Sequence, residues 1–261
     1  MSGWDSLERE LAVWREAGRR PTLWWRDDDA TGDLPSLRRL LALRREGATP
    51  LALAVIPDAI EPSLAPLLAG EEGVALLQHG FAHRNHAAPG EKKRELGSER
   101  PLERVLAEIA AGFARGRAVF AQAWLPVLVP PWNRIAPEVA SGLPALGLTG
   151  LSTHGRKPSP PAGLTQVNSH LDILSWRPRA AFRGEETVLA ELTAMLRARR
   201  LEDEPGEEEP LGLLTHHKQH DEGAWRFLFS LLSIASLQES VSWKPAESLF
   251  FAGEQGERTI Q

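Results

Sequence analysis

The stretch GVALLQHGFAHRNH, residues 73–86, joins a short apolar run to three histidines that fall within eight positions. A run of this length that turns abruptly polar is typical of a strand buried on both faces in a parallel sheet. The whole chain holds only eight histidines. Three of them at the end of one predicted strand therefore indicate a functional site at that end.

Six further short apolar runs occur along the chain, and amphipathic segments separate them. In one such segment, Leu37, Leu40 and Leu41 share a helical face. Alternating strands and helices predict an α/β fold, a (β/α) barrel that is closed or nearly closed, with a doubly wound open sheet as the alternative. We expect a single domain over residues 1–261. The predicted strands are 22–25, 50–56, 73–78, 125–129, 146–152, 164–168 and 211–215, and the predicted helices are 34–47, 101–115, 135–146, 186–200 and 221–237.

Charge and cysteine content exclude several classes of function. A net charge of −5 and a pI near 5.9 argue against a nucleic-acid partner. The chain has no cysteine, which excludes disulfides, thiolate metal sites and a cysteine nucleophile. The segment MSGWDSLEREL (1–11) lacks the apolar region of a signal peptide, and no apolar run approaches the ~20 residues that span a bilayer. We therefore expect a cytoplasmic protein with no membrane partner.

Polar groups directly follow five of the seven predicted strands. The carboxyl ends of the strands of a parallel barrel share one face, and active sites lie on that face. We therefore expect these groups to converge. They are the aspartates at 27–29, the histidines within 79–86, PPWNR at 130–134, His170 with Asp172, and HHKQHD at 216–221.

His79 and His83 are spaced four residues apart, so on a helix that followed the strand their imidazoles would point the same way. Two imidazoles and one carboxylate make a common catalytic metal site with open positions. Three adjacent carboxylates at 27–29 repel one another, and a bound cation would explain their clustering. The alternative is that the aspartates form a capping loop, although Asp33 is the expected cap of the next helix. We predict a divalent metal ion, of the Zn²⁺ type.

The order of these motifs resembles that of the polysaccharide deacetylases of the NodB-homology type, carbohydrate esterase family 4. The matching elements are Asp-Asp, His-x-x-x-His, Pro-Pro-aromatic and Leu-x-His, within residues 22–221. The resemblance implies a distorted (β/α) barrel and a metal-dependent hydrolase that removes an acyl group, above all N-acetyl, from a carbohydrate or a related soluble amide. The alternatives are an amidohydrolase acting on a non-sugar, ureide-like amide, and a non-catalytic sugar-binding relative.

The resemblance also implies roles for individual residues. Asp28 would be the general base and His216 the general acid, while the backbone N–H of Trp132 would stabilise the oxyanion. Two prolines precede Trp132, so its N–H is the first donor after that strand. In the alternative register Asp27 is the base and Asp28 the metal ligand. The implied metal ligands are Asp29, His79 and His83.

Val129 stands where the family has an arginine, and Arg26 or Arg134 are the candidates to replace that arginine. We expect the substrate, a small molecule or an oligosaccharide, to be contacted by Trp132, Asn133, Trp176 and His86.

Overall fold

A computed structural model of the protein describes residues 2–156, 160–201, 209–233 and 239–251. The chain forms two compact units. The first comprises Met1–Asp27, Leu34–Leu51 and Ser169–Lys244, and the second comprises Asp28–Asp33, Ala52–Asn168 and Pro245–Gln261. The chain leaves the first unit and enters the second within a single strand, β1 (Thr22–Ala30). Consecutive aspartates of this strand therefore belong to different units.

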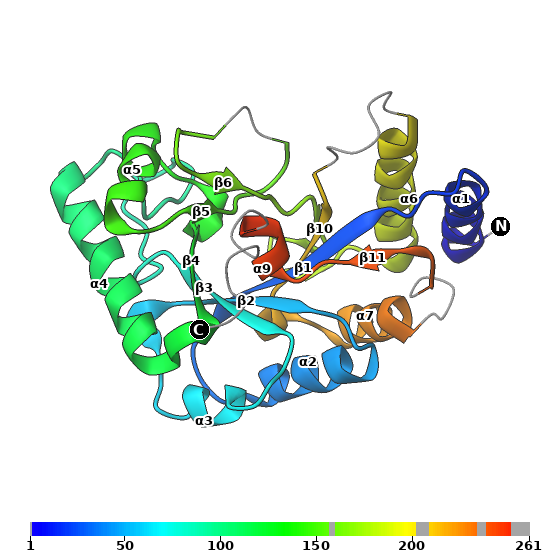
Figure 1. Ribbon diagram of the computed structural model, residues 1–261, viewed down its shortest axis with the longest axis horizontal. Helices are drawn as coiled ribbons and strands as arrows, with labels where there is room; N and C mark the ends of the chain where they lie inside the picture. The colour runs from blue at the N-terminus through cyan, green and yellow to red at the C-terminus, as the bar shows by residue number, and fades with distance from the viewer. Residues whose placement is uncertain (1, 157–159, 202–208, 234–238, 252–261) are drawn as a thin grey trace, which may run out of the picture. The chain divides into compact units, whose positions relative to one another are not determined.

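The first unit is built on parallel strands in the order β11-β1-β10-β7. The register of β1 with β10 runs from Leu23 opposite Leu211 to Asp27 opposite Thr215, so the polar ends of both strands lie side by side. Helices accompany these strands, and α1 packs against α6 while α2 packs against α7 (Figure 1). The elements are α1 (Gly3–Glu16), α2 (Pro35–Glu46), β7 (Leu171–Asp172), an antiparallel pair β8 (Leu174–Ser175) and β9 (Ala181–Phe182), α6 (Glu185–Leu201), β10 (Leu211–Thr215), α7 (Glu222–Ser233) and β11 (Ser242–Trp243).

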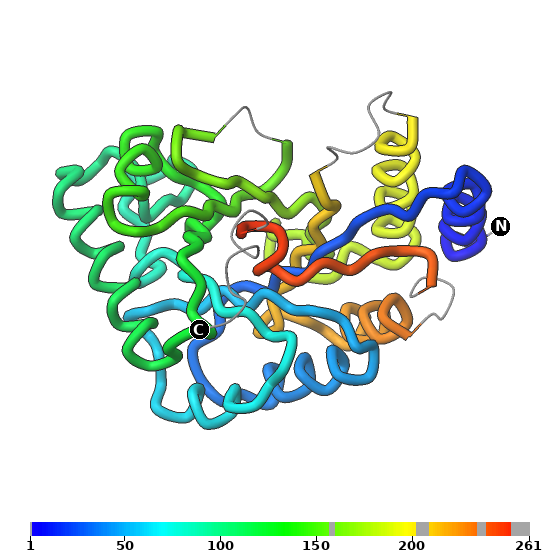
Figure 2. Tube along the Cα trace, viewed as in Figure 1, coloured from blue at the N-terminus to red at the C-terminus, as the bar shows by residue number. Residues whose placement is uncertain are grey.

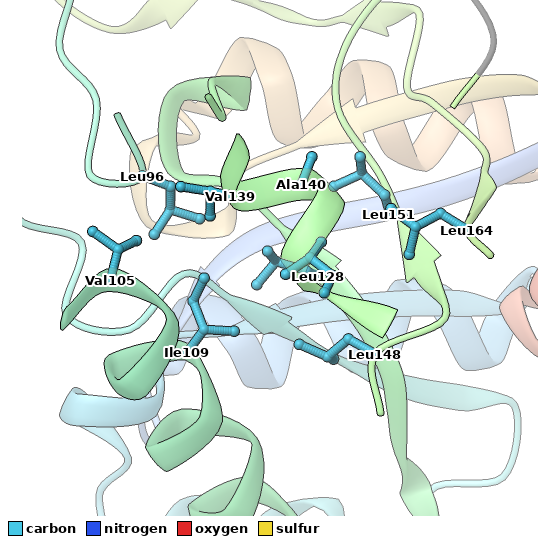
Figure 3. Close-up of a cluster of buried hydrophobic side chains, with 10 residues drawn as sticks. Leu96, Val105, Ile109, Leu128, Val139, Ala140, Leu148, Leu151 and Leu164 are labelled. Atoms are coloured by element: carbon cyan, nitrogen blue, oxygen red, sulfur yellow. The ribbon is translucent and has the colours of Figure 1, made fainter. Parts of the chain in front are cut away.

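The second unit contains strands in the order β6-β5-β4-β3-β2, and the β3–β4, β4–β5 and β5–β6 pairs are parallel. A core of aliphatic side chains from α4, α5, β4 and β5, together with neighbouring loop residues, fills its interior (Figure 3). The elements are β2 (Leu51–Val55), α3 (Leu64–Leu68), β3 (Val74–His79), α4 (Leu102–Phe120), β4 (Trp124–Val129), α5 (Pro137–Gly142), β5 (Gly150–Leu151), β6 (Thr165–Gln166) and α9 (Ala246–Phe250), with 3₁₀ turns η1 (Pro57–Ala59), η2 (Ala121–Ala123), η3 (Pro131–Asn133) and η4 (Pro144–Leu146).

The strands β3 and β4 end together, because His79 pairs with Val129 in the register. After β3 the chain runs without a helix until α4 begins at Leu102, and Figure 2 shows this path as an irregular loop. Two residues that follow the strand ends, Gly80 and Trp132, have left-handed backbone conformations. The carboxyl ends of these two strands thus carry the loops that build the candidate site.

The predicted α/β fold is confirmed: a strand overlaps each of the seven apolar runs, and each predicted helix is present in the part of the chain that the structure describes. The first strand is longer than predicted, because β1 continues to Ala30 and so contains the aspartates at 27–29. The last predicted helix ends at Ser233, and residues 234–237 of the prediction lie outside the described residues. The helix α1, whose Ser2 and Asp5 form a reciprocal capping box, was not predicted from the sequence. The prediction that Asp33 caps the next helix was wrong, because the N-cap of α2 is Leu34, which has no side-chain cap and is followed by Pro35.

Among the described residues, no helix combines the length and the apolar character that crossing a bilayer requires.

Candidate metal and catalytic site

The three predicted metal ligands meet at one point of the second unit. The Nε2 atoms of His79 and His83 lie 3.2 and 3.4 Å from the same oxygen, Oδ1 of Asp29. One ligand atom from each residue lies within 4.8 Å of the others, the only such group of three among the residues described. Two imidazole nitrogens and one carboxylate oxygen form the donor set of a catalytic Zn²⁺ site that keeps positions for water and substrate.

The orientation of His79 suits this role. Its Nδ1 lies 3.0 Å from the carbonyl oxygen of Val129 and donates a hydrogen bond to it. In the neutral imidazole Nε2 then carries the lone pair, and this nitrogen faces Asp29. A ligand histidine in metal sites is commonly held in this way through its other nitrogen. The residues present therefore fit a divalent cation.

The charges around His79 attract a cation. Burial is the largest influence and lowers the pKa of His79, but the carboxylates of Asp28 and Asp29 outweigh it, so the pKa lies above its usual value. The pKa of His83 is lowered, first by burial and then by the charge of His79. A metal ion would replace the proton that the carboxylates otherwise stabilise on His79.

The predicted helix after β3 is absent, so the spacing argument for His79 and His83 was wrong although the two imidazoles do converge. Gly80 has φ +57° and His83 has φ +54°, values that end any right-handed helix. The convergence arises from a turn of irregular backbone, and contacts distant in sequence must hold it.

Left-handed backbone is concentrated at this site. Of the six non-glycine residues with positive φ in the described chain, four are Asp29, His83, Trp132 and Asn133. Such conformations cost about 1–3 kcal/mol each and persist where the surrounding structure enforces them. Strain that clusters around a candidate ligand group is typical of a functional site.

Trp132 packs against His83, with 4.4 Å between the ring centroids, and the ammonium of Lys93 lies 6.0 Å from the Trp132 ring centroid. The ring of Trp132 therefore belongs to the wall beside the candidate ligands. Asn133 directly follows Trp132 in the turn η3, and its N–H donates to the carbonyl of Pro130.

In the first unit, Asp27 forms a completely buried group with two residues of the β10 end. Its carboxylate accepts hydrogen bonds from Thr215 Oγ1 at 2.6 Å and from the backbone N–H of His217 at 3.0 Å, and its other oxygen lies 2.5 Å from His217 Nδ1. Burial acts to raise the pKa of Asp27, but the charge and hydrogen bonds of His217 outweigh it and hold the pKa below its usual value. Sequence reasoning missed this pair, since nothing local links residues 190 positions apart.

Replacing Asp27 with alanine should lower the free energy of unfolding by about 3–5 kcal/mol, because a buried histidine and a buried N–H lose their partner. Urea unfolding of the full chain measures this difference. His217→Ala should have a similar effect, and the double variant should lose less than the sum of the two single losses. Wild-type stability in Asp27→Ala would contradict the structural role of the pair.

His216, the predicted general acid, precedes the turn η5 (His217–Gln219) and lies between the two residues that bind Asp27. Its ring meets that of Trp176 edge to face, with 4.6 Å between centroids. The indole Nε1 of Trp176 donates to Asp172 at 2.8 Å, although the side chain is 45% exposed. An exposed aromatic ring held beside His216 fits the predicted contact with substrate.

His220 provides a pH-dependent contribution to stability. Burial, the largest cause, lowers its pKa from 6.5 to about 4, and both ring nitrogens are buried without a hydrogen-bond partner in the described chain. The unfolded chain therefore takes up a proton below pH 6.5 that the folded chain does not take up until about pH 4. Stability should fall by roughly 3 kcal/mol as the pH drops through this interval, since one pKa unit corresponds to about 1.4 kcal/mol. His220→Phe, which keeps the ring packed on Trp225, should flatten this part of the profile in urea unfolding, and an unchanged profile would contradict the assignment.

The structure does not bring His86 into the ligand group. Its backbone N–H donates to the carbonyl of Arg94, and burial followed by the charge of Arg100 lowers its pKa. Of the two candidates to replace the family arginine, Arg134 donates to the carbonyl of Lys93, and Arg26 is fully buried in β1.

No protein-family model and no curated protein sequence matches the chain. A Mycobacterium smegmatis protein assigned to the polysaccharide deacetylases has a TM-score of 0.62 at 14% identity, with 93% of this chain and 94% of that chain covered. The peptidoglycan deacetylase PdaC of Bacillus subtilis has a TM-score of 0.51 at 12% identity, with 85% and 91% covered. A mutant of a carbohydrate esterase family 4 pseudoenzyme, with restored enzymatic activity, has a TM-score of 0.53 at 12% identity, with 85% and 63% covered.

These structural similarities agree with the order of strands and helices along the chain, and they confirm the predicted fold class. The chain has the distorted (β/α)-barrel fold of the NodB-type polysaccharide deacetylases of carbohydrate esterase family 4.

Proposed function

We propose that the protein is a metal-dependent deacetylase that hydrolyses an N-acetyl group on a carbohydrate or a related amide. The observation that carries the proposal is the convergence of Asp29, His79 and His83. The hydrogen bond from Nδ1 of His79 to the carbonyl of Val129 orients Nε2 of His79 toward the other two ligands. Solved structures of the same fold include deacetylases of peptidoglycan and other polysaccharides, which supports the substrate class.

In this proposal Asp29, His79 and His83 hold a Zn²⁺-type ion. When bound, such an ion lowers the pKa of water to about 7 and polarises a carbonyl. Asp28, buried and close enough to raise the pKa of His79, takes the proton of the attacking water. The Trp132 N–H donates to the oxyanion that develops on the carbonyl oxygen. His216 gives a proton to the leaving amine, and Trp176 stacks on the sugar.

The activity test uses the purified full chain, stripped of metal and reloaded with Zn²⁺. Acetate release is measured from N-acetylglucosamine oligomers and from an O-acetylated sugar, and disappearance of the substrate is measured for a ureide, each with and without chelator. Metal-dependent acetate release from the N-acetyl sugars supports the proposal. Turnover of the ureide alone supports the amidohydrolase alternative.

Two further outcomes bear on the remaining predictions. Sugar binding without release of acetate from any substrate would sink the enzymatic proposal and favour a non-catalytic relative, the reading to which the valine at position 129 points. Cytoplasmic location and a single-domain organisation stay predictions, and fractionation of the producing cells tests the first.

A further inference from the structure

The loop that carries His83 is organised around one buried carboxylate, that of Glu95. This side chain accepts three backbone hydrogen bonds, from Phe81 at 3.0 Å, Ala82 at 2.8 Å and Arg84 at 3.3 Å. Glu95 is 1% exposed, and the three donors flank His83 on both sides. Hydrogen bonds from backbone N–H groups to a charged carboxylate are among the stronger ones in proteins.

Contacts of its own backbone and of the next residue hold Glu95 in place. Its carbonyl accepts from Nη2 of Arg100 at 3.2 Å, and Nη1 of Arg100 donates to both carboxylate oxygens of Glu108 on α4. The next residue, Leu96, is fully buried in the core, and its carbonyl accepts from Ala136 at 2.8 Å. The backbone that carries the carboxylate is therefore anchored at Glu95 and at Leu96.

The residue after His79 is shaped to admit this carboxylate. A Cβ atom on Gly80 would lie 2.1 Å from Glu95 Oε2 and 2.6 Å from Cδ of Pro131. Gly80 also has φ +57°, a conformation that side chains disfavour. Gly80 thus provides both the space for Glu95 and the turn that carries the chain away from His79.

From these contacts we infer that Glu95 is a positioning residue, which fixes the backbone of 81–84 so that His83 Nε2 faces Asp29. In the absence of a helix after β3, these three hydrogen bonds take the place of the helical ladder in setting the direction of the second imidazole. The inference rests on the proposed metal site, and Glu95 itself touches neither metal nor substrate.

The experiment measures Zn²⁺ binding by titration calorimetry on the full chain, and amide exchange of the 80–85 segment on the metal-free chain. Glu95→Gln keeps the size of the side chain but replaces one acceptor with an N–H₂ donor that faces backbone donors. We expect Zn²⁺ affinity to fall about 10–100-fold, the usual effect of losing a residue that orients a ligand. Amides 81, 82 and 84 should exchange faster. The control is Glu103→Gln, which removes an equal charge from the exposed first turn of α4 and should leave both readings unchanged.

Wild-type affinity and wild-type exchange in a folded Glu95→Gln variant would overturn the inference. If Glu95→Gln fails to fold, Gly80→Ala gives the second test, because its methyl group displaces the same carboxylate, and a folded Gly80→Ala with wild-type affinity would overturn it as well. If the wild-type chain binds no Zn²⁺, the proposed function fails, while the exchange measurement still decides whether Glu95 holds the loop.

Discussion

His79→Ala should lower the affinity for Zn²⁺ by more than about 100-fold, beyond the range that follows from losing an orienting contact. The side chain supplies one of three ligand atoms, and the loss leaves the Asp29 carboxylate facing a single imidazole. His83→Ala and Asp29→Asn should have comparable effects. Titration calorimetry and metal analysis after dialysis measure the loss, with circular dichroism as the check on folding.

His86→Ala is the matched control, since His86 lies in the same loop and outside the ligand group. It should bind Zn²⁺ nearly as the wild type does. Substitutions to asparagine then distinguish the roles of the aspartates. Asp28→Asn should keep the metal and lose turnover. Retained metal in Asp29→Asn, together with lost metal in Asp28→Asn, would contradict the assignment and favour the register in which Asp27 is the base.

His216→Ala should lower kcat by about 10²–10⁴-fold on an N-acetyl sugar, the range expected for a general acid. An amine is a poor leaving group unless it is protonated, whereas the leaving group of an activated ester needs little protonation. The loss should therefore be much smaller on an activated acetate ester, and metal content should not change. Steady-state kinetics on both substrates measure the two losses with the same preparation.

An equal loss of kcat on amide and activated ester would refute the acid role and leave His216 as a binding or structural residue. Loss of metal in His216→Ala would instead make it a ligand. Interpretation requires that the variant remain folded, because Thr215 and His217 on either side are bonded to the buried Asp27. Urea unfolding of His216→Ala provides that check.

Much of the fold was predictable because each buried strand is a short apolar run, and the polar residues at the strand ends mark where the runs stop. The three metal-ligand candidates could be chosen for the same reason. What could not be predicted is how the chain turns after β3. The spacing of His79 and His83 suggested a helix. In the inference drawn above, the direction of His83 depends instead on hydrogen bonds from the backbone of 81–84 to Glu95. An irregular loop joins these residues, and its path has no sequence pattern from which the contact could be predicted.

The aspartate run at 27–29 shows a second limit. Because the three residues are identical and adjacent, the local sequence does not indicate which partner each of them contacts. Their partners come from distant parts of the chain. Asp27 meets Thr215 and His217 of the first unit, whereas Asp29 meets His79 and His83, which lie with it in the second unit. The resemblance to a family with two aspartates could narrow the choice of register, but it contained no role for the third.

The left-handed residues of the site have a consequence for engineering. At Asp29, His83 and Trp132, glycine would adopt the same backbone with less conformational energy, so a search for thermostable variants by backbone preference alone would select glycine there. Each such exchange would remove a side chain on which the proposed chemistry depends. Stabilisation of this protein should therefore be sought at exposed helix positions, and the strained backbone of the site should be left as it is.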